Sequence, residues 1–143
     1  MTLCTADRGR LFGETVDDQM IDNPYAKIVR RCWEDLPNHY PHVALDAFVI
    51  MPNHVHGVIV LSEYNADDAP VRHGLPEIMR ALKTYSARRI NALRGTPGTA
   101  VWQRSYYEHI VRDENALGRI REYIVANSRN WRKDQEYVPR RRT

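Results

Sequence analysis

Two apolar runs in the middle of the chain, residues 42–50 and 54–61, constrain the fold more than any other feature. Both are rich in Val, Ile, Leu and Phe, and both are far shorter than the roughly 20 residues of a membrane-spanning helix. The segment Met51-Pro52-Asn53 between them has the composition of a turn. The two runs therefore predict a central antiparallel hairpin, around which the rest of the chain must pack.

Helical spacing of apolar residues and capping signals predict the elements on either side of this hairpin. In chain order, they are a hairpin of residues 1–7 and 10–16, a helix at about 23–36 ended by Pro37, a surface loop at 62–73, a helix at about 76–93, short strands near 100–104 and 107–112, and a helix at about 114–127 capped by Asp113. This order predicts an α+β fold, with an antiparallel sheet and helices mainly on one face. A chain of 143 residues suits one domain, which we place at 1–139, followed by a basic tail at 140–143.

Composition limits where the protein works and what it binds. The start of the chain has no basic segment followed by an apolar one, so we expect a cytoplasmic protein with no secretory signal and no membrane partner. Cys4 and Cys32 are far apart in sequence, which predicts reduced structural thiols. Of the 21 basic residues, three are lysines and the other 18 are arginines, the side chain best suited to forked phosphate contacts. The composition is compatible with a nucleic-acid partner but does not require one.

The spacing of His54 and His56 on the second strand of the central hairpin is the first sign of chemistry. Because side chains alternate across a pleated strand, both imidazoles project from the same face. Such a pair can bind a divalent metal ion and leaves coordination positions for a third protein ligand and a substrate oxygen. Two strand histidines without an ion would have the same spacing, so the motif needs support from elsewhere in the chain.

The last predicted helix supplies that support. Arg119, Tyr123 and Asn127 are spaced by four residues and so share one helical face. The Tyr123 phenol could act as a nucleophile if a nearby cation stabilised its phenolate, and the amide oxygen of Asn127 could be the third ligand of that cation. A tyrosine at the edge of the core is the commoner structural role. The chain also offers three competing tyrosines, Tyr85, Tyr106 and Tyr107.

Basic residues on the predicted helix at 76–93 and several residues after it are candidate DNA contacts. An exposed helix normally carries a charged flank, so phosphate binding and a solvated surface are equal alternatives there. Tyr106, beside a predicted strand, could stack on a base or pack against the sheet. The candidate contacts are Arg80, Lys83, Arg88, Arg94, Arg104, Tyr106 and Arg119.

Four motifs in linked order indicate a family. They are Met51-Pro52-Asn53-His54-Val55-His56-Gly57, Val101-Trp102-Gln103-Arg104, His109-Ile110-Val111-Arg112-Asp113-Glu114 and Arg121-Glu122-Tyr123-Ile124-Val125-Ala126-Asn127. In this order and spacing they resemble the REP-associated tyrosine transposases, relatives of the single-tyrosine HUH transposases of small insertion sequences. The resemblance covers nearly the whole chain, and it implies a ferredoxin-like or RRM-like HUH endonuclease fold.

The resemblance also implies roles for individual residues. His54 and His56 match the HUH metal ligands, Tyr123 matches the nucleophile, and Asn127 matches the position of the third, amide-type ligand. The family uses Mg²⁺ or Mn²⁺, binds hairpin-forming single-stranded DNA, and holds the 5′ phosphate on tyrosine while a 3′ hydroxyl is released. Some relatives are dimers that pair the histidines of one chain with the tyrosine helix of the other, so a homodimer is one expected assembly.

We therefore expect an enzyme, a transposase-type endonuclease and strand transferase that works through a 5′-phosphotyrosine intermediate. An alternative is a hairpin-DNA or RNA-binding protein, derived from a transposase, that has lost catalysis and binds through the basic helix flank, Tyr106 and Tyr107. A weaker alternative is a metal-dependent nuclease that activates water instead of Tyr123, whose products would never be linked to protein.

Overall fold

The computed structural model describes residues 1–62, 74–134 and 136–137. The predicted loop at 62–73, apart from its first residue, and the predicted tail at 140–143 lie outside this described part. Among the described helices, none is both long and apolar enough to cross a membrane.

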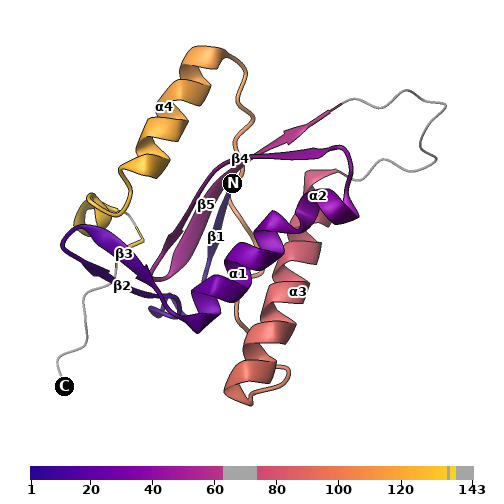
Figure 1. Cartoon of the computed structure of the whole chain (residues 1–143), viewed down its shortest axis with the longest axis vertical. Helices are drawn as coiled ribbons and strands as arrows, with labels where there is room; N and C mark the ends of the chain where they lie inside the picture. Colours follow the sequence, from indigo (N-terminus) through magenta and orange to yellow (C-terminus); the bar gives the residue numbers. More distant parts are fainter. Residues whose placement is uncertain (63–73, 135, 138–143) are drawn as a thin grey trace.

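A three-stranded antiparallel sheet lies at the centre of the structure (Figure 1). It contains β1 (Thr2–Cys4), β4 (Val43–Met51) and β5 (His54–Leu61), in the order β1-β5-β4. The predicted central hairpin is confirmed, because β4 and β5 pair from Met51 opposite His54 to Val43 opposite Leu61. The tight turn at Pro52 and Asn53 therefore fixes the register of the whole hairpin.

The predicted hairpin of residues 1–7 and 10–16 is wrong. β1 pairs instead with β5, and β2 (Gly13–Val16) pairs with β3 (Gln19–Asp22) in a separate two-stranded sheet. The turn between β2 and β3 places Asp17 and Asp18 at positive φ, as expected for a two-residue hairpin turn. β1 joins the central sheet, where Leu3 and Cys4 are buried. The burial of these two side chains stabilises the pairing of β1 with β5 more than a local turn would stabilise the predicted hairpin.

The helices begin and end where the sequence provides caps. α1 (Pro24–Glu34) starts after Asn23, whose side chain accepts a hydrogen bond from the backbone nitrogen of Ala26. The other helices are α2 (Leu36–His39), α3 (Leu75–Arg94), α4 (Glu114–Val125) and the short 3₁₀ helix η1 (Trp131–Lys133). Pro37 does not simply end the first helix as predicted but lies in the first turn of α2, where a proline needs no hydrogen-bond donor.

The strands predicted near 100–104 and 107–112 are also wrong. This part of the chain meets β1 at two isolated bridges, Thr2 with Tyr107 and Thr5 with Trp102, and otherwise runs without strand pairing. β1 has only three residues, so it offers too short an edge for a continuous ladder. Trp102 is nevertheless buried, and its indole nitrogen donates a hydrogen bond to the hydroxyl of Ser86 on α3.

The two faces of the sheet carry different helices. Val55 and the neighbouring core residues face α1, α2 and α3, whereas His54 and His56, which alternate with Val55, face the side of α4. Figure 1 shows α1 and α3 on one side of the sheet and α4 on the other. The prediction of an α+β fold with helices mainly on one face is confirmed. In the part of the chain that the structure describes, α4 and the short helix η1, whose Trp131 lies beside His54, cover the histidine face.

Gly57 makes the close packing of α1 against the sheet possible. A Cβ atom at this position would lie 2.6 Å from the Cη2 atom of Trp33, whose ring stacks on Phe48 with 4.4 Å between centroids. We therefore expect Gly57→Ala to lower the free energy of unfolding by about 1–3 kcal/mol, because both rings are held in place by their neighbours. Chemical denaturation measures this loss. An unchanged denaturation midpoint would show that Trp33 moves aside freely.

Candidate active site

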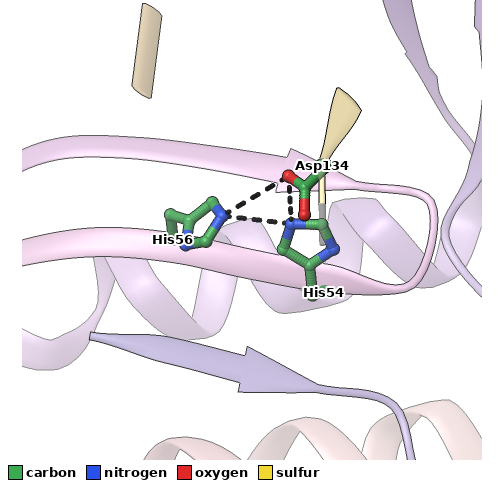
Figure 2. A group of neighbouring side chains, drawn as sticks. All are labelled: His54, His56 and Asp134. Carbon is green, nitrogen blue, oxygen red and sulfur yellow. Dashed lines mark hydrogen bonds and ion pairs between the residues drawn. The ribbon is translucent and has the colours of Figure 1, made fainter. Parts of the chain in front are cut away.

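His54 and His56 project from β5 toward a third potential ligand, Asp134. Their Nε2 atoms are 3.1 Å apart, and the Oδ2 atom of Asp134 lies 3.3 Å from Nε2 of His54 and 3.9 Å from Nε2 of His56 (Figure 2). The side chains of His54 and Asp134 are 0% and 2% exposed. These three residues form a cluster with the donor types that could hold a divalent metal ion.

The tautomer of His54 follows from the hydrogen bonds of Asn53. The amide nitrogen of Asn53 donates to the backbone carbonyl oxygens of Arg8 and Glu136, at 3.0 and 2.7 Å. Its amide oxygen therefore faces Nδ1 of His54, at 2.8 Å, and accepts a hydrogen bond from that nitrogen. With Nδ1 donating to Asn53, the ring turns Nε2 toward the cluster, which is the orientation that a metal ligand requires.

His56 is oriented in a similar way from the other edge of the sheet. Its Nδ1 atom lies 2.8 Å from the hydroxyl oxygen of Thr2, the residue opposite it on β1. Burial lowers the pKa of His56 below its usual value, although the nearby carboxylate of Asp134 acts in the opposite direction. His56 is therefore neutral at neutral pH and has a lone pair to offer a cation.

Asp134 is charged despite its burial. Burial alone would raise the pKa of its carboxyl, but the contacts with His54 and His56 outweigh this effect and hold the pKa well below its usual range. At neutral pH, the cluster therefore consists of one carboxylate and two imidazoles. Asp134 was not predicted as a site residue, because it follows the last predicted helix in a stretch with no apolar periodicity.

Tyr123 reaches this cluster from α4. Its ring centroid lies 5.6 Å from that of His56, with the rings nearly edge to face, and the residue is 49% exposed. Partial burial and the negative charge of Asp134 raise the pKa of Tyr123, while the side chain of Asn127 acts to lower it. The phenol is therefore protonated at neutral pH and needs a cation nearby to become a better nucleophile.

Asn127 follows α4 and is buried, at 2% exposure. Its Oδ1 atom is enclosed but has no hydrogen-bond partner among the described residues. An enclosed amide oxygen of this kind is unfavourable unless something binds it. The structure therefore brings His54, His56, Tyr123 and Asn127 into one region of a single chain.

The helix that carries Tyr123 is attached to the sheet at few points. All residues of α4 are described, and Ile124 is the one that is fully buried. A register shift in β4 between Leu45 and Phe48 places Asp46 opposite the helix, where its two carboxylate oxygens accept hydrogen bonds from Arg121 at 2.8 and 2.6 Å. Arg121 is two residues before Tyr123, so this ion pair holds the helix over the histidine face near the tyrosine.

A cleft of about 1100 Å³ is lined by residues of α4 and β5, including His56 and Tyr123. Its walls are mainly apolar and include Val58, Val60, Ile110, Leu117 and Ile120. Arg112 and His109 add polar groups from the segment before α4. Because His56 and Tyr123 are both in its lining, the cleft adjoins the candidate active site.

The candidate DNA contacts fall into two groups. Arg80, Lys83, Arg88 and Arg94 lie on α3, which packs on the face of the sheet opposite the histidines. Two of them have structural partners, since Lys83 donates to the carbonyl oxygen of Arg104 at 2.8 Å and Arg94 to the amide oxygen of Asn91 at 2.9 Å. The second group is Arg104, Tyr106 and Arg119, of which Tyr106 packs partly against the core while the two arginines are exposed.

Comparison with known proteins identifies the class. Residues 3–127 match the family model described as IS200-like transposase. The match covers most of the chain and includes His54, His56, Tyr123 and Asn127, so the chain belongs to the IS200-like transposase family.

Individual relatives narrow the identification. An uncharacterized protein of Haemophilus influenzae is 36% identical over 150 residues, which cover 96% of this chain and 83% of that protein. A second protein of the same organism, assigned as a REP-associated tyrosine transposase, is 29% identical over 111 residues, which cover 72% of this chain and 58% of that protein. The resemblance to REP-associated tyrosine transposases is thereby confirmed.

Two solved structures share the fold. One is a REP-associated tyrosine transposase bound to a REP hairpin, with a TM-score of 0.63, 16% identity, and coverage of 96% of this chain and 79% of that one. The other is a protein of Deinococcus radiodurans R1 assigned as a transposase, with a TM-score of 0.53, 24% identity, and coverage of 87% and 85%. Both likenesses support the HUH-type α+β fold of this chain.

Proposed function

We propose that this transposase cuts and rejoins single-stranded DNA through a covalent bond to Tyr123, with Mg²⁺ or Mn²⁺ bound by His54, His56 and Asn127. The observation that carries this proposal is the 5.6 Å approach between the rings of Tyr123 and His56 within one chain. A nucleophile and a metal site in this proximity are what phosphoryl transfer to a tyrosine requires. Because both come from the same chain, a homodimer is compatible with the site but is not needed to complete it.

The proposed reaction exchanges one phosphate ester for another. The Tyr123 oxygen attacks the phosphorus atom, the bond from phosphorus to the 3′ oxygen breaks, and the phenol proton ends on the released 3′ hydroxyl. The 5′ phosphate stays on Tyr123. Attack by a 3′ hydroxyl of the same or another strand reverses these steps and reseals DNA without ATP.

The residues of the cluster fit a divalent cation. The Oδ1 atom of Asn127 and the Oδ2 atom of Asp134 are both buried and lack hydrogen-bond partners in the described part of the chain. Carboxylate and amide oxygens are ligands of Mg²⁺ and Mn²⁺, and the two imidazole nitrogens are donors that a transition ion such as Mn²⁺ accepts more readily than Mg²⁺ does. When bound, the cation would polarise the phosphate and stabilise negative charge during attack. Asn53 and Thr2 would hold the two imidazoles in the orientation that binding requires.

The proposed substrate is single-stranded DNA that forms a hairpin, placed in the cleft between α4 and β5. The structural relative bound to a REP hairpin supports this substrate class. The apolar walls of the cleft could contact bases, and exposed Arg119 and Arg104 could contact phosphates. Such a substrate would place the protein in the cytoplasm.

A covalent adduct tests the proposal. Labelled single-stranded hairpin DNA from beside the gene is incubated with the protein and Mn²⁺, and the products are separated under denaturing conditions. We expect a labelled band at the size of the protein plus the 5′-linked fragment, which EDTA prevents. Cleavage without any protein-linked product would contradict the tyrosine mechanism and favour activation of water.

The alternative of a hairpin-binding protein without catalysis is supported by one observation. The basic residues of α3 lie on the opposite face of the sheet from the candidate active site, so nucleic-acid binding there would not depend on the metal. Salt-sensitive hairpin binding in EDTA, combined with no adduct in Mg²⁺ or Mn²⁺, would favour this alternative.

A further inference from the structure

We propose that Asp134 is a ligand of the metal ion, and that His54, His56 and Asp134 hold the ion even without Asn127. This inference rests on the proposed function in assuming that the cluster binds a divalent cation, but it concerns a residue outside the four motifs of the family. It also changes the source of the third ligand, from the end of the nucleophile helix to the segment beyond it.

The first reason is the state of the Asp134 carboxylate. Its side chain is 2% exposed, and its Oδ2 atom has no hydrogen bond from any described residue. Its neighbours are Nε2 of His54 at 3.3 Å and Nε2 of His56 at 3.9 Å, both of them potential metal ligands. A buried oxygen that lacks a hydrogen-bond donor and faces two imidazole nitrogens is well placed for a cation that would bind all three atoms.

The second reason is geometric. Ligands at neighbouring positions of an octahedral ion, with bonds of roughly 2.1 Å, lie about 3 Å apart, and ligands at opposite positions lie about 4.2 Å apart. The separations in the cluster are 3.1, 3.3 and 3.9 Å. All three fall within this range, so one ion can contact both Nε2 atoms and Oδ2 after small side-chain adjustments.

The third reason is that the segment carrying Asp134 is fastened to the body of the protein. The guanidinium of Arg10 lies 5.6 Å from the ring centroids of both Trp131 and Tyr137, which flank Asp134 in sequence. Trp131 is buried beside His54, with 5.8 Å between ring centroids. The carbonyl oxygen of Glu136 accepts a hydrogen bond from Asn53. The same asparagine therefore orients His54 and anchors the segment that presents Asp134.

This arrangement separates retention of the ion from placement of the nucleophile. Tyr123 and Asn127 lie on or just after α4, whose contact with the sheet depends mainly on Ile124 and the Arg121–Asp46 ion pair. His54, His56 and Asp134 come from β5 and from the anchored segment. The ion would stay bound while α4 shifts to admit or release DNA, and Asn127 would join the coordination sphere when the helix is in place.

Metal binding in the absence of DNA tests this proposal. Mn²⁺ affinity is measured by the loss of the free-ion signal in electron paramagnetic resonance, for the wild-type protein and for Asp134→Asn, Asn127→Ala and Arg132→Gln. We expect Asp134→Asn to weaken Mn²⁺ binding by at least about tenfold, and Asn127→Ala to weaken it less. Arg132→Gln is the control on the same segment, since it removes one charge from an exposed side chain, and it should bind Mn²⁺ as the wild type does.

Thermal unfolding separates ligand loss from damage to the fold. The metal-free Asp134→Asn protein should still unfold cooperatively, at a temperature somewhat below that of the metal-free wild type, because the contacts of the carboxylate with His54 and His56 are lost. The rise in melting temperature that Mn²⁺ gives the wild type should be lost in this variant. Asp134→Glu should recover part of that rise.

Two results would overturn the proposal: wild-type affinity in Asp134→Asn, or no Mn²⁺ binding by the wild type. These measurements use no DNA, so their outcome is independent of covalent attachment. Metal binding that requires Asp134 in a protein that never forms an adduct would support the ligand assignment and contradict the strand-transfer function. Adduct formation by the wild type, together with unchanged Mn²⁺ affinity in Asp134→Asn, would support the strand-transfer function and contradict the ligand assignment.

Discussion

Tyr123→Phe is expected to reduce covalent attachment of DNA by about 10³-fold or more, while hairpin binding and thermal stability stay close to those of the wild type. The change removes only the attacking oxygen, and loss of an essential nucleophile commonly has an effect of this size or larger. The ring beside His56 would remain. Denaturing electrophoresis measures the adduct, and filter binding measures affinity for DNA.

Tyr85→Phe is the matched control for this experiment. Tyr85 also lies on a long helix and is 45% exposed, close to the 49% of Tyr123, but α3 is on the other face of the sheet. It should form the adduct at the wild-type rate. Retention of the adduct by Tyr123→Phe would assign the attack to another residue, and loss in both variants would point to a general effect of removing a phenol.

The second large effect concerns the imidazole pair. Either His54→Ala or His56→Ala should weaken Mn²⁺ binding by at least about 100-fold, since loss of groups that merely orient ligands already costs about 10–100-fold. Each variant should also lose adduct formation, because Tyr123 would have no cation to stabilise charge during attack. Calorimetry measures the affinity, and the same adduct assay measures activity.

His39→Ala is the control for the histidine variants. His39 ends α2, is partly exposed, and pairs with Asp35 at 2.8 Å, away from the cluster. It should bind Mn²⁺ normally. If His54→Ala and His56→Ala also bind Mn²⁺ with wild-type affinity, the ion is not at this site and the assignment of the cluster fails.

Much of the fold was predictable because its strongest signals are local. The turn at Pro52 and Asn53 between two apolar runs gave the central hairpin, and Asn23 and Asp113 marked the starts of two helices. The pairing of β1 with β5 was not predicted, because Thr2 and His56 are far apart in sequence and nothing local links them. Burial of Leu3 and Cys4 decides that pairing, and burial is a property of the assembled core.

The candidate site was predictable to a similar extent. Alternation of side chains along a strand predicted that His54 and His56 share one face. The order of the motifs predicted Tyr123 as the nucleophile and Asn127 as a ligand, on or just after the last helix. Asp134 was missed because an aspartate in an irregular segment has no periodic signal, and its position depends on Asn53 and Arg10, which are distant in sequence. The anchoring of α4 by Asp46 was missed for the same reason, since it depends on a register shift within β4.

The residue that becomes attached to DNA is the most direct test of this account. After reaction with single-stranded hairpin DNA and Mn²⁺, the protein is digested with nuclease and protease, and the modified peptide is sequenced by mass spectrometry. The account predicts a nucleotide phosphate on the phenolic oxygen of Tyr123. A phosphate on Tyr85, Tyr106 or Tyr107, or cleaved DNA with no modified peptide, would contradict it.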